Sequence, residues 1–304
     1  DRMVVAEIDG TVTWINLTDI GEQASTKMVH SKRLTAIALA SNGRQLMTGC
    51  ADGFVRIWDC EFPKQMPTEI PMGTAVDALA LCNDRRELFV ACGNGGIRKL
   101  DLDSNEWIEP HLDHAPQVNC FAVSTDENSI ACGTTDGEVI VRDTGTLQTR
   151  YIRKHRGRIN SLAYSREGSK LVSTSSDGTA IVWEAETGLS ISTLSYGRDV
   201  NSARFYGNDE FVLLAGFDGE ASLWSVETGK RVGVSFPHPN FITRCVVDYA
   251  KNEALTACGD GSVRGWPLPQ AMSIESNRVT EFLQNRTGLH LTRKGAAILY
   301  DPVD

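Results

Sequence analysis

The chain has 304 residues, of which 41% are hydrophobic and 23% charged, so it is long and apolar enough to bury a full core. Its formal net charge of −9 argues against a general nucleic-acid binder, which needs a strong positive field. No run of about 18 apolar residues occurs, and the eight cysteines lack the paired spacing of a zinc site. We therefore expect no membrane span, no metal and no cofactor.

Asp-Gly turns recur along the chain at a nearly constant interval. They begin at Asp9, Asp52, Asp136, Asp177, Asp218 and Asp260, and we take Gly95-Gly96 as a degenerate third member. The steps between the seven turns are 43, 43, 41, 41, 41 and 42 residues. Short apolar runs flank each turn, which predicts antiparallel strands joined tightly. A fixed period of this length indicates a repeat architecture.

The expected strands follow in chain order. The first unit keeps only its second and third strands, at residues 4–8 and 11–17. The second unit has strands at residues 34–40, 45–50 and 54–58, and the third, fourth and sixth units have inner strands at 76–81, 118–123 and 200–205. The fifth unit is the most complete, with strands at 159–164, 171–175, 180–183 and 189–194. After Pro267 the period ends, and the pattern predicts a helix over 275–286 and a hairpin over 289–291 and 296–300.

The fifth unit, from His155 to Gly188, resembles a complete WD repeat. The resemblance implies an all-β, seven-bladed β-propeller over residues 1–268, with a first blade that lacks its start. Residues 269–304 would form a helix-hairpin tail packed on the propeller. In propellers of this family one segment supplies the outer strand of the last blade and the inner strand of the first. We therefore expect roughly 20 residues outside this sequence to complete both blades.

The family's buried tetrad joins a histidine, a Ser or Thr, the turn aspartate and a tryptophan by hydrogen bonds. Carried over to this sequence, three complete tetrads are expected: His30, Thr48, Asp52 and Trp58; His155, Ser173, Asp177 and Trp183; and His238, Thr256, Asp260 and Trp266. The alternative for the fifth unit is a catalytic Ser-His-Asp set, which the recurrence of the spacing in other units disfavours.

The loops that lead into the inner strands are the face that partners of this family most often use. Basic side chains lie at equivalent loops of two separate units in an otherwise acidic protein, and they suit an acidic or phosphorylated peptide. The candidate partner-binding residues are Lys32, Arg33, Gln117, Arg156, Arg158 and Phe241.

These observations favour a cytoplasmic, non-catalytic scaffold that binds a protein or peptide rather than nucleic acid. Two alternatives stay open. The tail, with Trp266 to Gln270 reading WPLPQ, resembles the end of bacterial Ser/Thr protein kinases fused to WD repeats. The chain would then be the regulatory portion of a kinase whose catalytic domain lies elsewhere. The second alternative is a propeller enzyme with a site in the channel mouth.

Overall fold

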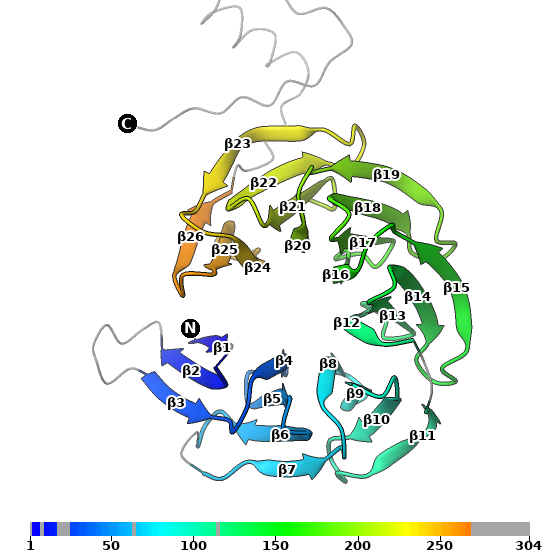
Figure 1. The fold of residues 1–304 in the computed structure, drawn as a ribbon, viewed down its shortest axis with the longest axis vertical. Coiled ribbons are helices and arrows are strands. Elements are labelled where there is room, and N and C mark those ends of the chain that lie inside the picture. Colours follow the sequence, from blue (N-terminus) through cyan, green and yellow to red (C-terminus); the bar gives the residue numbers. More distant parts are fainter. Residues whose placement is uncertain (1, 7–8, 17–24, 63–64, 114–115, 269–304) are drawn as a thin grey trace, which may run out of the picture.

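The computed structural model describes residues 2–6, 9–16, 25–62, 65–113 and 116–268. Within these ranges the chain forms 26 strands in seven antiparallel sheets, and it contains no helix. The sheets follow one another in chain order around a common centre, as the blades of a β-propeller do (Figure 1). The all-β propeller predicted from the sequence is confirmed.

We number the sheets 1 to 7 in chain order. Sheet 1 contains β1 (Arg2–Ala6), β2 (Thr11–Asn16) and β3 (Ser25–Val29). Sheet 2 contains β4 (Leu34–Leu39), β5 (Gln45–Cys50), β6 (Phe54–Asp59) and β7 (Thr68–Pro71). Sheet 3 contains β8 (Val76–Cys82), β9 (Glu87–Cys92), β10 (Ile97–Asp101) and β11 (Trp107–Leu112). Sheet 4 contains β12 (Val118–Val123), β13 (Ser129–Thr134), β14 (Glu138–Asp143) and β15 (Thr149–Lys154).

The remaining sheets repeat this pattern. Sheet 5 contains β16 (Ile159–Tyr164), β17 (Lys170–Ser175), β18 (Thr179–Glu184) and β19 (Ser190–Ser195). Sheet 6 contains β20 (Val200–Tyr206), β21 (Phe211–Gly216), β22 (Glu220–Ser225) and β23 (Arg231–Pro237). Sheet 7 contains β24 (Ile242–Asp248), β25 (Glu253–Cys258) and β26 (Val263–Pro267). The first strand of sheets 2 to 7 lies nearest the centre, and the fourth strand, where one is described, lies outermost (Figure 1).

Burial explains why the middle strands are the most apolar. In β5 and β17 five of the six residues are buried, since these strands have a neighbouring strand on each side and a neighbouring sheet on each face. The outer strand β15 alternates between exposed and half-buried residues instead. Its sequence, TRYIRK, is correspondingly polar.

The core lies between successive sheets. One cluster joins sheets 2 and 3 through Met47, Val76 and Leu100, and another joins sheets 5 and 6 through Val182, Val200 and Phe205. Similar clusters join sheets 1 and 2, 3 and 4, 4 and 5, and 6 and 7. Each sheet is therefore stabilised mainly by its neighbours, as in other repeat proteins.

The tight turn of the third unit differs from the sequence prediction, which placed it at Gly95-Gly96. Gly95, not Gly96, has the left-handed backbone, with φ of 87°. Its N–H donates to the carbonyl of Cys92, while the Asn94 side chain accepts from the N–H of Gly96 at 3.1 Å. Asp52 makes the same contact with Phe54 in sheet 2. The turn is therefore Asn94-Gly95, because the amide oxygen of asparagine replaces the carboxylate oxygen.

Two other sequence predictions concern the first sheet and the tail. Sheet 1 has a third strand, β3, which the sequence analysis did not predict. The expected tail helix and hairpin lie outside the described residues.

Candidate functional site

Hydrogen bonds connect His155, Ser173, Asp177 and Trp183 in sheet 5. His155 contacts the Asp177 carboxylate through Nδ1 at 3.2 Å and the Ser173 hydroxyl through Nε2 at 2.7 Å. The Trp183 indole N–H donates to the same hydroxyl at 2.8 Å. His155 is buried, and burial lowers its pKa, although Asp177 opposes the shift. The histidine is therefore neutral at pH 7.

Asp177 is held by more than the histidine. Its carboxylate accepts hydrogen bonds from the backbone N–H of Arg156 at 2.9 Å, and from the N–H and hydroxyl of Thr179 at 2.9 and 2.6 Å. Burial acts to raise the pKa of Asp177, but these hydrogen bonds outweigh it and the pKa is lowered overall. The aspartate thus fixes the loop that leads into β16, which carries two of the candidate binding residues.

In sheets 2 and 7 the expected tetrads lose the link between histidine and aspartate. His30 contacts the carbonyl of Gly10 through Nδ1 at 2.9 Å, whereas Asp52 pairs with Arg56 at 2.9 Å and with the Ser31 hydroxyl at 2.7 Å. Arg56 explains the difference, since its guanidinium attracts the carboxylate away from the ring. The histidine, threonine and tryptophan remain connected, through Thr48 in sheet 2.

Sheet 7 shows the same loss. His238 contacts the carbonyl of Phe236 through Nδ1 at 3.2 Å, and its Nε2 contacts the Thr256 hydroxyl at 2.8 Å. The Trp266 indole donates to that hydroxyl as well, at 2.8 Å. Asp260 instead accepts from the N–H and hydroxyl of Ser262, within its own turn. Two of the three expected tetrads are therefore three-membered.

Sheet 6 has a connection that the sequence analysis missed. The Tyr196 hydroxyl, in the position of the histidine, donates to Asp218 at 2.5 Å and lies 2.5 Å from the carbonyl oxygen of Glu220. Leu214 replaces the family's Ser or Thr, and the Trp224 indole donates to Ser222 instead, at 3.0 Å. The phenol thus keeps a direct link to the turn aspartate, which the histidines of sheets 2 and 7 lack.

A ring of polar side chains surrounds the channel where the inner strands begin. Each described inner strand has a register shift just after its first residue. The residues at the shift are Thr35, Asp77, Asn119, Asn160, Asn201 and Thr243. The three asparagine side chains each donate to the carbonyl of the first inner-strand residue of the next sheet, at 2.7, 3.0 and 2.8 Å. These contacts hold neighbouring inner strands together at the channel mouth.

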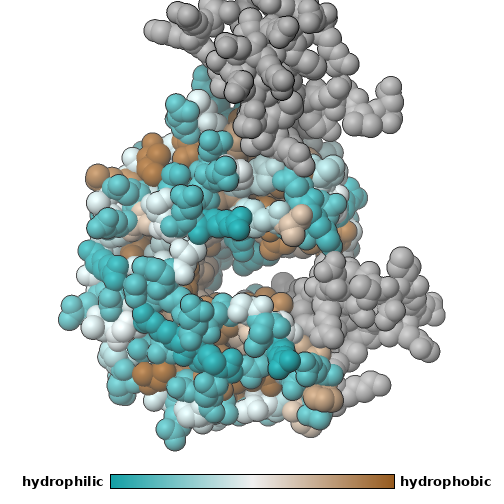
Figure 2. Space-filling view, turned by 180° about the vertical axis from the view of Figure 1, so that it is seen from behind, coloured by the Kyte–Doolittle hydropathy of each residue, from teal (hydrophilic) through white to brown (hydrophobic). Residues whose placement is uncertain are grey.

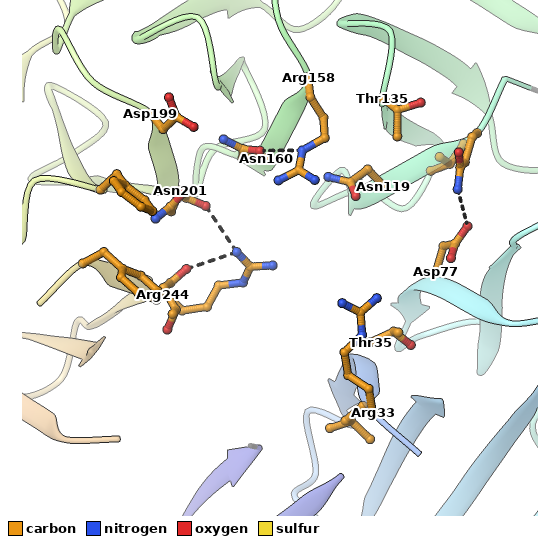
Figure 3. A pocket seen from close by; sticks show the side chains of 16 residues that line it. Arg33, Thr35, Asp77, Asn119, Thr135, Arg158, Asn160, Asp199, Asn201 and Arg244 are labelled. Carbon is orange, nitrogen blue, oxygen red and sulfur yellow. Dashed lines mark hydrogen bonds between the residues drawn. The ribbon is translucent and has the colours of Figure 1, made fainter. Parts of the chain in front are cut away.

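A cavity of about 580 Å³ opens above this ring (Figure 3). Four of the six candidate binding residues line it, namely Arg33, Gln117, Arg158 and Phe241. Lys32 and Arg156 are exposed and are not among the lining residues. The sequence analysis missed Arg244, which extends into the same space (Figure 3).

The cavity has a charged part and an aromatic part. The rings of Phe217 and Phe241 stack with centroids 5.3 Å apart and an interplanar angle of 9°. Across the cavity, the Gln117 amide donates to the Asp77 carboxylate at 3.4 Å. Burial raises the pKa of Asp77, although Gln117 and the positive charge of Arg33 oppose the shift.

The face that lies behind the view of Figure 1 is mostly hydrophilic. Figure 2 shows one face on which hydrophobic residues occur as separate small groups among polar ones. Exposed large side chains such as Met66 and Leu189 lie in the loops before β7 and β19, which belong to different sheets. Single exposed apolar residues of this kind are normal on a folded protein and do not indicate a binding site.

Within the described ranges, no group of three or more His, Cys, Asp or Glu side chains could hold a metal ion. In the same part of the chain, no helix is long and apolar enough to cross a membrane.

Comparison with known proteins gives the family. The family model described as the nucleolar protein 10-like, N-terminal domain matches residues 2–224. No curated protein matches the chain. A chain in the crystal structure of a mitotic checkpoint complex is similar in fold, with a TM-score of 0.78 and 20% sequence identity, over 88% of this chain and 84% of that one. The family match ends before the tail, so the likeness of the tail to kinase fusions stays a prediction. The chain is a WD-like β-propeller and belongs to the nucleolar protein 10-like, N-terminal domain family.

Proposed function

We propose that the chain is a non-catalytic protein-interaction scaffold, built as a ring of seven blades. Its partner is an acidic or phosphorylated peptide or protein, bound on the face that carries the channel mouth. A propeller fold supports a scaffold, because its loops present many side chains on one rigid face.

The observation that carries this proposal is the position of the basic loop residues. Lys32 and Arg33 precede β4, and Arg156 and Arg158 precede β16, so all four belong to loops at the same end of the channel. Arg33 and Arg158 line one cavity although they come from sheets that are not neighbours. The arrangement places positive charge at the mouth of a protein whose net charge is −9.

Binding of fluorescently labelled acidic peptides, with and without phosphoserine, tests the proposal. The double variant Lys32→Glu/Arg156→Glu reverses two exposed charges outside the cavity, and the backbone N–H of Arg156 can still hold Asp177. We expect it to weaken peptide binding at least tenfold, and wild-type affinity should fall as salt rises.

The matched control is Arg166→Glu/Lys230→Glu. These exposed residues lie in turns at the opposite ends of the strands from the mouth. The control should bind as the wild type does. Equal weakening in both double variants would show that only net charge matters and would refute a defined binding face.

A further inference from the structure

Arg244 occupies a position where the other inner strands have small side chains. The residue two places after the start of the inner strand is Ala36, Ala78, Cys120, Ser161 or Ser202 in sheets 2 to 6. Each of these residues pairs with the second strand directly after the register shift, as Arg244 does with Ala257. Arg244 therefore extends into space that small residues on the other sheets leave open.

Two more guanidinium groups point into this space. Figure 3 shows Arg33, Arg158 and Arg244 directed toward the same opening from three different sides. Asn160 accepts a hydrogen bond from Nε of Arg158 at 3.1 Å, which orients that side chain. One terminal nitrogen of Arg244 donates to the carbonyls of Asn201 and Thr243, at 3.2 and 3.1 Å. Among the residues that the structure describes, most N–H donors of these two groups have no hydrogen-bond partner, which leaves them for a ligand.

None of the three arginines has a carboxylate oxygen within 4.0 Å among the described residues. Burial lowers the pKa of Arg244, and the positive charges of Arg204 and Arg158 act in the same direction, while Cys120 and Cys245 oppose the shift. The charges of Arg158 and Arg244 thus repel each other. Asp77 and Asp199 also line the cavity, but Gln117 already contacts Asp77. An anion held between the guanidinium groups would relieve the repulsion.

We propose that the channel mouth binds a phosphate group between Arg33, Arg158 and Arg244. Three guanidinium groups that converge from separate sheets suit a tetrahedral anion, whose oxygens point in several directions. A carboxylate is planar and would occupy one guanidinium. The inference rests on the proposed function, whose acidic or phosphorylated partner it narrows to one chemical group. The phosphate belongs either to a phosphorylated residue of a protein or to a soluble phosphate compound.

Isothermal titration calorimetry at low salt with two probes distinguishes these sources. One probe is a short phosphoserine peptide, with its unphosphorylated form as reference, and the other is inorganic tripolyphosphate. Wild-type protein should bind at least one of them. Binding of the phosphopeptide but not of its unphosphorylated form identifies a protein partner, whereas stronger binding of tripolyphosphate identifies a soluble compound.

Arg244→Ala should weaken binding at least tenfold, while Lys230→Ala, an equal loss of charge in a turn at the opposite end of the strands, should change it less than threefold. Alanine occupies the equivalent position in sheets 2 and 3, so we expect Arg244→Ala to fold, which circular dichroism checks. Arg244→Lys, which keeps the charge but loses the planar fork, should bind with intermediate affinity.

Two results would overturn the inference: no heat of binding from either probe at millimolar concentration, or equal weakening by Arg244→Ala and Lys230→Ala. The proposed function fails separately. If Lys32→Glu/Arg156→Glu leaves peptide binding unchanged while Arg244→Ala abolishes tripolyphosphate binding, the phosphate site stands and the peptide-binding face is wrong.

Discussion

Replacing Asp177 by alanine tests whether the tetrad of sheet 5 holds the propeller together. The carboxylate accepts hydrogen bonds from the Arg156 N–H and from the N–H and hydroxyl of Thr179, and it contacts His155. Its side chain is 12% exposed, and that of His155 is 0% exposed. A hydrogen bond to a charged group contributes about 1.5–3 kcal/mol to the free energy of unfolding. In the variant, water at the loop can accept hydrogen bonds from the donors that lose the carboxylate, and this offsets part of the cost. We expect Asp177→Ala to lower the free energy of unfolding by about 2–4 kcal/mol.

Asp260→Ala is the matched control, because the same turn position in sheet 7 makes no contact with its histidine. Asp260 accepts hydrogen bonds within its own turn, from the N–H and the hydroxyl of Ser262. Urea unfolding followed by circular dichroism should therefore show a much lower midpoint for Asp177→Ala than for Asp260→Ala. Equal midpoints would show that the turn, and not the link to His155, accounts for the stabilisation.

Two further predictions concern buried and half-buried polar groups. Burial lowers the pKa of His30, His155 and His238 below 6.5, so the unfolded chain binds protons first and stability should fall as the pH drops below about 6.5. A fully titrating histidine changes the free energy of unfolding by up to about 1.4 kcal/mol per pH unit. The urea midpoint should therefore fall from pH 7.5 to 6.5 to 5.5, and it should fall less steeply in His155→Asn. A urea midpoint that rises toward pH 5.5 would contradict this prediction. Tyr196→Phe should lower the urea midpoint, because it removes the hydroxyl that donates to Asp218. In Tyr196→Phe/Asp218→Ala the second change should lower the midpoint less than Asp218→Ala does alone, and what remains is the loss of the bond from the Glu220 N–H. Fully additive effects of the two changes would show that the hydrogen bond contributes nothing.

The repeat was predictable from the sequence because its turns are chemically constrained. A left-handed backbone at the second turn residue favours glycine, and a side-chain oxygen at the first residue accepts the N–H two residues later. Asn94-Gly95 obeys the same rule with an amide in place of a carboxylate. A sequence pattern that allows either Asp or Asn before the glycine would therefore have predicted the Asn94-Gly95 turn.

The outer strand β3 was harder to predict. Outer strands have a neighbouring strand on one side only, so they need few apolar residues, and β3 reads STKMV. The hydrophobic pattern of such a sequence does not distinguish a strand from a loop.

The location of the chain in the cytoplasm stays a prediction, because the fold does not depend on it.

The site was predictable in part. Loops before inner strands indicated Arg33, Gln117, Arg158 and Phe241, because strand order alone places such loops at one end of the channel. Arg244 lies inside a strand, where a polar residue has no obvious meaning in a single repeat. Comparing the inner strands position by position would have shown one arginine among small residues. The link between Asp52 and Arg56 depended on two side chains competing for one carboxylate, which spacing alone does not reveal.

Hydrogen–deuterium exchange of the chain with and without a saturating acidic phosphopeptide tests the central claim most directly. If the partner binds at the channel mouth, amides in the loops at residues 31–34, 156–159 and 239–242 should exchange more slowly in the complex. Amides in the turns at residues 165–169 and 226–230, at the other end of the strands, should not change. Protection confined to those opposite turns, or to the outer strands β15 and β19, would show that the partner binds elsewhere.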